Sequence, residues 1–390
     1  MGSGHGRAEF QGAMSSQRGA PRADIDITTL ARRRSPRSFR HMALLEVRDL
    51  RKFFPIRRGL FGKTVGHVHA VDGVSFDLEA GSALGLVGES GCGKTTLGRC
   101  LLRLLEPTAG SVRIDGTDVL GLPRRKLRPF RRHVQMIFQD PYGSLNPRLT
   151  VGEILAEPLI VHRLADRREA EEQAGRLLER VGLTRAHLGH YPHQFSGGQR
   201  QRIGIARALA LKPKLIVCDE PVSALDVSVQ AQVLNLLKDL QQEFGIAYLF
   251  ISHDLAVVSH LCPRVAVMYL GEIVEIGPVE QILERPLHPY TQALLSAVPS
   301  GVPGQHQQRI ILEGDPPSPL EPSSAKRFTS RFPKHAAAFD TGNITLKEVG
   351  PGHLVRCARL EVLQDMATTS VSARAKSAHH AAPMLVPAPQ

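Results

Sequence analysis

Apolar residues in this chain recur at two spacings, which together predict a layered fold. Unbroken apolar runs at residues 83–87, 215–218 and 247–251 have the length and composition of strands buried on both faces. Leucines at helical spacing follow the first run, and residues 227–244, between the other two, have the pattern of a helix. This alternation of strand and helix predicts an α/β fold with a mostly parallel sheet.

The segments around these runs differ in character. From residue 44 to residue 87, short β-like runs alternate with turns and predict further strands. Leucine spacing between about residues 150 and 210 predicts a helical insertion, which includes a helix over residues 200–211. Later runs at residues 264–269 and 272–276 meet at Leu270 and Gly271 as a predicted hairpin, and a short helix is expected at residues 291–297.

Both ends of the chain lack such periodicity. Residues 1–42 are rich in Gly, Ser, Ala and Arg, and we expect a disordered basic leader or tag there, with residues 364–390 as a disordered tail. The formal net charge of the chain is +12. Residues 1–64 contribute +9 of this charge, from fourteen Lys/Arg and five Asp/Glu. The basic character therefore favours a solvated leader over a surface for nucleic acid or anionic lipid.

Five cysteines, none in CxxC spacing, disfavour a disulfide framework and a zinc site and fit a reducing cytosol. No apolar stretch reaches the roughly 18 residues of a membrane span, and the N-terminus lacks the apolar core of a secretory signal. Any association with a membrane is therefore expected to come through a partner.

A glycine-rich loop between the first apolar run and its helix carries the clearest chemistry. Its Gly-x4-Gly-Lys-Thr pattern at a strand-to-helix turn is that of a phosphate-binding P-loop, in which backbone N–H groups and the helix N-terminus face one anion. Lys94 is expected to reach the β- and γ-phosphates, and the Thr95 hydroxyl to ligate Mg²⁺. The predicted phosphate-binding residues are Gly88, Glu89, Ser90, Gly91, Cys92, Gly93, Lys94, Thr95 and Thr96.

Acidic residues and a histidine follow the other two apolar runs. Asp219 suits a Mg²⁺ ligand, and Glu220 suits a general base that polarises the attacking water. His253 follows the next strand and would contact the γ-phosphate and position that water. An acidic pair is often only a strand cap, and a lone histidine is usually structural, but the upstream P-loop favours the functional interpretation.

A second glycine motif precedes the helix predicted over residues 200–211. Ser196, Gly197, Gly198 and Gln199 stand where a helix N-terminus offers free N–H groups, which makes a second anion site. Because the domain already has a P-loop, this site makes most sense when two such domains pack head to tail and each completes the other's ATP site.

The order of these motifs resembles that of ABC-transporter ATPases. The resemblance implies a RecA-like P-loop core with an antiparallel β subdomain and a helical subdomain. It makes Gln139 the Q-loop glutamine that senses Mg²⁺ and water, residues 196–199 the signature, and His253 the switch histidine. It also makes Asp226 the last residue of the D-loop and one of the residues that bind the nucleotide. The implied metal ligands are Thr95, Gln139 and Asp219, and the implied catalytic residues are Glu220, His253, Gln139 and Lys94.

Three further segments resemble the dipeptide/oligopeptide importer ATPases, namely residues 139–148, 268–271 and 288–295. Residues 53–71 are similar to the F-type subunit, which implies a heterodimer with a D-type ATPase under two transmembrane permease subunits, supplied by a peptide-binding protein. Phe54 aligns with the aromatic residue that stacks on adenine, although it could also be a core residue. The implied domains are the ATPase at residues 43–285 and a small C-terminal domain at 286–363.

Relatives often carry four cysteines in the C-terminal domain that ligate an iron–sulfur cluster. The corresponding positions here are Lys326, Phe332, Phe339 and Cys357. Since one thiolate cannot replace four ligands, we predict no cluster and expect apolar packing instead.

The resulting hypothesis is an ATP- and Mg²⁺-dependent ATPase that energises di- or oligopeptide import at the cytoplasmic face of the plasma (inner) membrane, without nucleic acid. Import of nickel or glutathione is an alternative, because related importers share these motifs. A soluble ABC ATPase acting on DNA or ribosomes is less favoured, since the chain has neither two ATPase domains nor a long coiled-coil insertion. Residues 196–199 and His253 disfavour a P-loop kinase.

Overall fold

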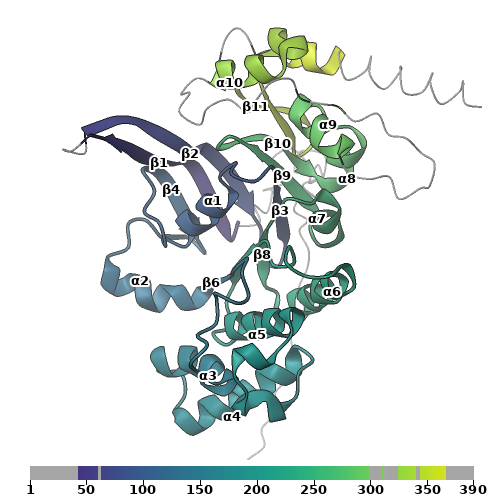
Figure 1. Ribbon diagram of the computed structural model, residues 1–390. Helices are drawn as coiled ribbons and strands as arrows, with labels where there is room; N and C mark the ends of the chain where they lie inside the picture. Colours follow the sequence, from purple (N-terminus) through teal and green to yellow (C-terminus); the bar gives the residue numbers. More distant parts are fainter. Residues whose placement is uncertain are drawn as a thin grey trace, which may run out of the picture. The chain divides into compact units, whose positions relative to one another are not determined.

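The computed structural model describes residues 43–59, 63–297, 310, 312, 324–339 and 343–365, which fall in one compact unit (Figure 1). The predicted leader at 1–42 and the predicted tail beyond residue 365 lie outside the described residues. Gln364 and Asp365, which the predicted tail included, belong to a helical turn over residues 360–365.

The core is an eight-stranded sheet in the order β11-β12-β10-β9-β3-β8-β7-β6. Five neighbouring strands in it run parallel, which confirms the α/β prediction. They are β9 (Arg264–Tyr269), β3 (Ala83–Val87), β8 (Ala247–Ser252), β7 (Leu215–Asp219) and β6 (Val134–Ile137).

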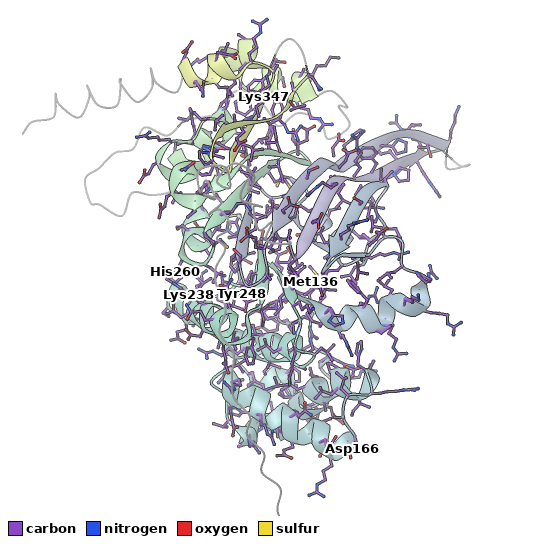
Figure 2. The ribbon with its side chains drawn as sticks, turned by 180° about the vertical axis from the view of Figure 1, so that it is seen from behind. Met136, Asp166, Lys238, Tyr248, His260 and Lys347 are labelled. Atoms are coloured by element: carbon purple, nitrogen blue, oxygen red, sulfur yellow. The ribbon has the colours of Figure 1, made fainter. Side chains whose placement is uncertain are left out.

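Alternate side chains of these buried strands enter two different cores. In β8, Leu249 and Ile251 pack with the antiparallel strands, while Tyr248 and Phe250 pack with the helices on the opposite face. Tyr248 of β8 belongs to one of these cores and Met136 of β6 to the other; both residues are labelled in Figure 2. Burial on both faces explains why these strands are unbroken apolar runs.

An antiparallel sheet in the order β2-β1-β4-β5 covers one face, together with α1 (Lys94–Leu101) and α2 (Arg124–Phe130). Strands β1 and β2 confirm the β-like segment predicted before residue 87. The short 3-10 helix η1 (Arg131–His133) leads into β6. The strands are β1 (Leu45–Arg58), β2 (Lys63–Leu78), β4 (Ala109–Ile114) and β5 (Thr117–Asp118).

Helices α5, α6 and α7 cover the opposite face, and α5 also contacts the pair α3 and α4 (Figure 1). Capping boxes at Thr150 and Asp166 begin α3 and α4. Two short 3-10 helices, η2 (Arg185–Gly189) and η3 (Pro192–Gln194), precede α5. The helices are α3 (Val151–Val161), α4 (Arg167–Arg180), α5 (Gly197–Leu209), α6 (Val227–Phe244) and α7 (Leu255–Leu261).

Helix α5 begins three residues earlier than predicted. Ser196 is its N-cap and forms a capping box with Gln199, so the two glycines between them are already helical. The sequence itself has the Ser-x-x-Gln pattern of such a box, and this signal could have corrected the expected start at Arg200.

The predicted hairpin joins β9 to β10 (Glu272–Pro278). Leu270 and Gly271 have φ values of 44° and 86°, the left-handed pair that a tight two-residue hairpin turn requires. Helix α8 (Val279–Glu284) follows β10 directly.

The C-terminal strands extend the core sheet and do not form a sheet of their own, because β12 (His353–Cys357) pairs with β10 and β11 (Thr345–Gly350) pairs with β12. The boundary between residues 285 and 286 stays a prediction. The other C-terminal elements are α9 (Pro289–Ser296), α10 (Ser324–Arg331) and η4 (Pro333–Ala338). Among the described residues, no helix is both long and apolar enough to cross a membrane.

Candidate active site

The carboxyl ends of β3, β6, β7 and β8 meet at one edge of the sheet, and each is followed by a predicted site residue. The loop after β3 turns through left-handed glycines. A Cβ at Gly88 would lie 2.2 Å from the Met268 carbonyl oxygen, and one at Gly93 would lie 2.0 Å from that of Ala70. Neither position can carry a side chain, so the loop requires glycine at both.

Lys94 lies at the first position of α1 and is 4% exposed. Its ammonium group donates hydrogen bonds to the carbonyl oxygens of Gly88, at 2.8 Å, and Glu89, at 2.9 Å. The cation is therefore held inside the loop, beside the N–H groups at the start of the helix.

Thr95 and Asp219 form the second part of the site. The Thr95 hydroxyl donates to the Asp219 carboxylate at 2.9 Å. Burial raises the pKa of Asp219, and the hydrogen bond from Thr95 partly opposes this shift. A hydroxyl oxygen beside a buried carboxylate suits Mg²⁺, which prefers hard oxygen ligands, so the residues present fit this ion.

The other two predicted catalytic residues, Gln139 and His253, lie beside the Glu220 carboxylate. Gln139 Nε2 donates to Glu220 Oε2 at 3.0 Å, and His253 Nδ1 lies 3.5 Å from the same oxygen. The Glu220 backbone has a φ of 45°, which is uncommon for a residue other than glycine, and its N–H donates to the Ile251 carbonyl. This arrangement can hold a carboxylate toward a water molecule in front of the loop.

The motif at residues 196–199 begins α5. Ser196 is exposed and accepts a hydrogen bond from the Gln199 N–H at 3.3 Å. Buried Arg200 fixes the preceding turn by donating to the carbonyl oxygens of Pro192 and His193, and its guanidinium lies 3.8 Å from the centre of the Tyr142 ring. The helix N-terminus is thereby presented at the surface. Asp226, at the start of α6, is also exposed.

Phe54 lies in β1, paired with Val68, and its side chain is 36% exposed, so it is not a core residue. Lys52 Nζ lies 4.9 Å from the centre of the Phe54 ring. Stacking of adenine on the Phe54 ring stays a prediction.

Comparison with known proteins identifies the family. A family model described as "ABC transporter" matches residues 71–223, and one described as "Oligopeptide/dipeptide transporter, C-terminal region" matches residues 274–337. The oligopeptide transport ATP-binding protein AppF of Bacillus subtilis is 53% identical over 317 residues, covering 80% of this chain and 96% of AppF. The chain belongs to the ATP-binding subunits of the oligopeptide/dipeptide family of ABC transporters. It is an ABC-type ATPase with the predicted fold.

Other relatives of this ABC ATPase agree. The probable peptide ABC transporter ATP-binding protein y4tS of Sinorhizobium fredii is 56% identical over 291 residues, 75% of this chain and 82% of y4tS. The glutathione import ATP-binding protein GsiA of Pectobacterium atrosepticum is 55% identical over 288 residues, 72% of this chain and 46% of GsiA.

Solved structures give the same fold. The dimeric ATP-binding cassette MJ0796 bound to ADP and Pi matches with a TM-score of 0.54 at 29% identity, covering 60% of this chain and 98% of that one. CbiO1 from Clostridium perfringens, part of the ABC transporter complex cbiONQ, matches with a TM-score of 0.54 at 25% identity, covering 63% and 92%.

The four positions predicted to correspond to cluster cysteines differ from one another in their surroundings. Phe332, Phe339 and Cys357 are buried in one core together with the ring of Phe328, whereas Lys326 is exposed. Phe328 and Phe339 have ring centres 5.0 Å apart. Apolar packing therefore occupies three of the four positions. In the part of the chain that is described, no group of three or more His, Cys, Asp or Glu is arranged to hold a metal ion.

Two contacts to the loop come from later segments and were not predicted from the sequence. The Glu89 N–H donates to the Tyr290 hydroxyl at 2.9 Å, and the Gly271 N–H donates to the Cys92 carbonyl at 2.9 Å. Both Tyr290 and Gly271 stand in segments that marked the subfamily, but no local pattern indicated that they touch the phosphate-binding loop.

Proposed function

We propose that this ATPase energises the import of di- and oligopeptides, as the F-type member of a heterodimer with a D-type ATPase. The pair would lie under two transmembrane permease subunits at the cytoplasmic face of the plasma (inner) membrane and would act on cargo from a peptide-binding protein. The match of residues 274–337 to the oligopeptide/dipeptide transporter C-terminal region carries this proposal. The name of AppF, an oligopeptide transport protein, agrees with it.

Hydrolysis would take place at the edge of the parallel strands. The loop at residues 88–96 would hold the phosphates of ATP, and the Lys94 ammonium would reach the β- and γ-phosphate oxygens. Mg²⁺ held by Thr95 and Asp219, with Gln139 reaching the same side, would neutralise charge on the phosphate oxygens.

Glu220 would orient the attacking water and accept its proton. The water oxygen forms a bond to the γ-phosphorus as the bond from that phosphorus to the ADP oxygen breaks, which releases ADP and phosphate. Gln139 would keep the carboxylate of Glu220 in place, and His253 would contact the γ-phosphate.

The second half of each site would come from the partner ATPase. Ser196 and Asp226 are exposed, as residues that meet a partner's nucleotide need to be. An N-terminal helix end suits the γ-phosphate. The related cassette MJ0796, solved as a dimer with ADP and Pi, supports pairing of two such domains.

Glutathione is the second candidate cargo, because GsiA is named as a glutathione import protein and is 55% identical to this chain over 288 residues. Both candidates use the same ATPase chemistry. Only the binding protein and the permease subunits distinguish them.

The test is cargo uptake by proteoliposomes that contain this chain, its partner ATPase, the permease and the binding protein. Labelled dipeptides, longer peptides, glutathione and nickel are offered separately, with Glu220→Gln as the inactive control. ATP-dependent accumulation of peptide supports the proposal. Accumulation of glutathione or nickel alone would overturn the peptide assignment while leaving the ATPase assignment intact.

A further inference from the structure

The C-terminal segment reaches into the phosphate-binding loop through one hydroxyl group. Tyr290, at the second position of α9, is 0% exposed, and its hydroxyl oxygen accepts the Glu89 N–H at 2.9 Å across 201 positions of sequence. Burial raises the pKa of Tyr290, so the phenol stays neutral and keeps its proton. The loop is thus hydrogen-bonded to an element outside the P-loop motif.

This hydrogen bond and one from Lys94 hold the two ends of the same peptide group. The peptide between Gly88 and Glu89 gives its N–H to Tyr290 and receives the Lys94 ammonium on its carbonyl oxygen, at 2.8 Å. Hydrogen bonds at the two ends of one peptide polarise it and strengthen each other. The orientation of this peptide, and through it the place of the Lys94 ammonium, therefore depends on the Tyr290 hydroxyl.

Neighbouring C-terminal residues fix Tyr290 in turn. The Tyr290 N–H donates to His288 Nδ1 at 3.2 Å, and its ring centre lies 4.5 Å from that of Tyr269. His288 packs against Phe332 and Phe339, with ring centres 5.8 Å and 5.4 Å away. The ring that carries the hydroxyl is thus part of an aromatic core with little room for movement.

A second set of hydrogen bonds also connects the C-terminal segment with the phosphate-binding loop. Arg327 of α10 is 1% exposed and donates to the Leu270 carbonyl at 3.1 Å, at the hairpin turn where Gly271 donates to Cys92 of the loop. Helix α9 therefore contacts the phosphate-binding loop directly. Helix α10 contacts the β9–β10 turn, which is in turn hydrogen-bonded to the loop.

We propose that Tyr290 is a positioning residue for the phosphate-binding loop and that the C-terminal segment, residues 286–363, sets the loop's affinity for nucleotide through it. This inference rests on the assignment of residues 88–96 as the ATP phosphate site and is independent of the cargo. The C-terminal segment thereby takes part in ATP binding.

The test compares two variants of the full chain that each lose one buried phenolic hydroxyl. Tyr290→Phe removes the bond to Glu89, while Tyr269→Phe is the matched control, because the Tyr269 hydroxyl has no hydrogen-bond partner in the described structure. ATP affinity is measured by calorimetric titration with Mg²⁺ present. We expect Tyr290→Phe to raise the Kd about three- to tenfold, as for the loss of one hydrogen bond, and Tyr269→Phe to leave it unchanged.

Amide hydrogen exchange in the wild-type chain supplies a readout that needs no variant. The side chain of Glu89 is exposed, yet its N–H should exchange slowly because Tyr290 accepts it. Rapid exchange at Glu89, or equal Kd values for Tyr290→Phe and wild type, would overturn the inference. Equal weakening by both phenylalanine variants would also overturn it, since only a general loss of packing acts that way.

The assignment of the loop is checked separately with Lys94→Ala. If that variant binds ATP as tightly as the wild type, the phosphate site itself is wrong. If Lys94→Ala loses ATP binding while Tyr290→Phe keeps it, only the role of Tyr290 is wrong.

Discussion

The side-chain amide of Gln139 donates a 3.0 Å hydrogen bond to the carboxylate of Glu220, although 81 positions separate them in sequence. Each residue follows a parallel strand, β6 or β7, and these strands are neighbours in the sheet. Parallel pairing brings the two carboxyl ends to one edge, so the contact follows from the strand order. Gln139 thereby orients the group that we propose as the general base.

Replacing that base should separate binding from hydrolysis. Glu220→Gln keeps the size of the side chain and leaves Lys94, Thr95 and Asp219 in place. We expect turnover to fall about 10²- to 10⁴-fold, the usual contribution of a general base, while the ATP Kd changes less than about threefold. Steady-state hydrolysis and equilibrium binding measure the two quantities. Hydrolysis at the wild-type rate would show that another group takes the proton.

The Thr95 hydroxyl should matter specifically for Mg²⁺. Thr95→Val keeps the β-branched shape but removes the hydroxyl that contacts Asp219. We expect the Mg²⁺ concentration for half-maximal hydrolysis to rise at least about tenfold, consistent with the loss of one oxygen ligand. Binding of ATP in EDTA is the internal control and should hardly change. A parallel loss of metal-free ATP binding would indicate a damaged loop.

Two adjacent glycines at the start of α5 offer a matched pair for stability. A Cβ at Gly198 would lie 2.4 Å from Val229 Cγ1, whereas one at Gly197 would meet only Leu225 Cδ2 at an ordinary 3.6 Å. Because valine is stiff at χ1, Gly198→Ala should lower the free energy of unfolding by about 1–3 kcal/mol, and Gly197→Ala should leave it nearly unchanged. Denaturant unfolding of both variants checks this. Equal stability of the two would mean that α5 and α6 pack less closely there.

A buried histidine should make the fold sensitive to acid. Burial lowers the pKa of His288 from 6.5 to about 3, with His335 and Arg356 adding to the shift. Between these values the unfolded chain binds a proton that the folded chain does not, so stability falls as the pH drops below about 6.5. From pH 7 to pH 5, His288 should contribute a loss of about 2 kcal/mol.

His288→Asn isolates this contribution, because asparagine can still accept the Tyr290 N–H at the start of α9. The variant should be less stable at neutral pH but should lose less stability between pH 7 and pH 5. His260→Asn, on the exposed side of α7, is the control for the loss of an imidazole. An unchanged pH slope in His288→Asn would place the acid sensitivity elsewhere.

Local patterns were sufficient for the core of the fold and for the placement of the site. Residues 215–218 and 247–251 are apolar because both faces of their strands are buried, and the ends of these strands place Glu220 and His253. The glycines of the loop are required by close backbone contacts and are therefore visible in sequence.

Contacts between distant segments were not predictable in this way. Nothing in the sequence around Tyr290 indicates that its hydroxyl accepts the Glu89 N–H, since a buried tyrosine in a short helix has many possible partners. The pairing of β12 with β10 likewise depends on the path of the chain, because either strand alone is compatible with several neighbours. Such long-range pairing is decided by the tertiary fold.

In the proposed importer, ATP hydrolysis at Glu220 is coupled to peptide delivery. The most direct measurement is the ATPase rate of the reconstituted transporter with empty binding protein and with peptide-loaded binding protein. We predict that loaded binding protein raises the rate severalfold and that Glu220→Gln in this chain removes most of the increase. A rate that is the same with and without every peptide offered would contradict the coupling to peptide import.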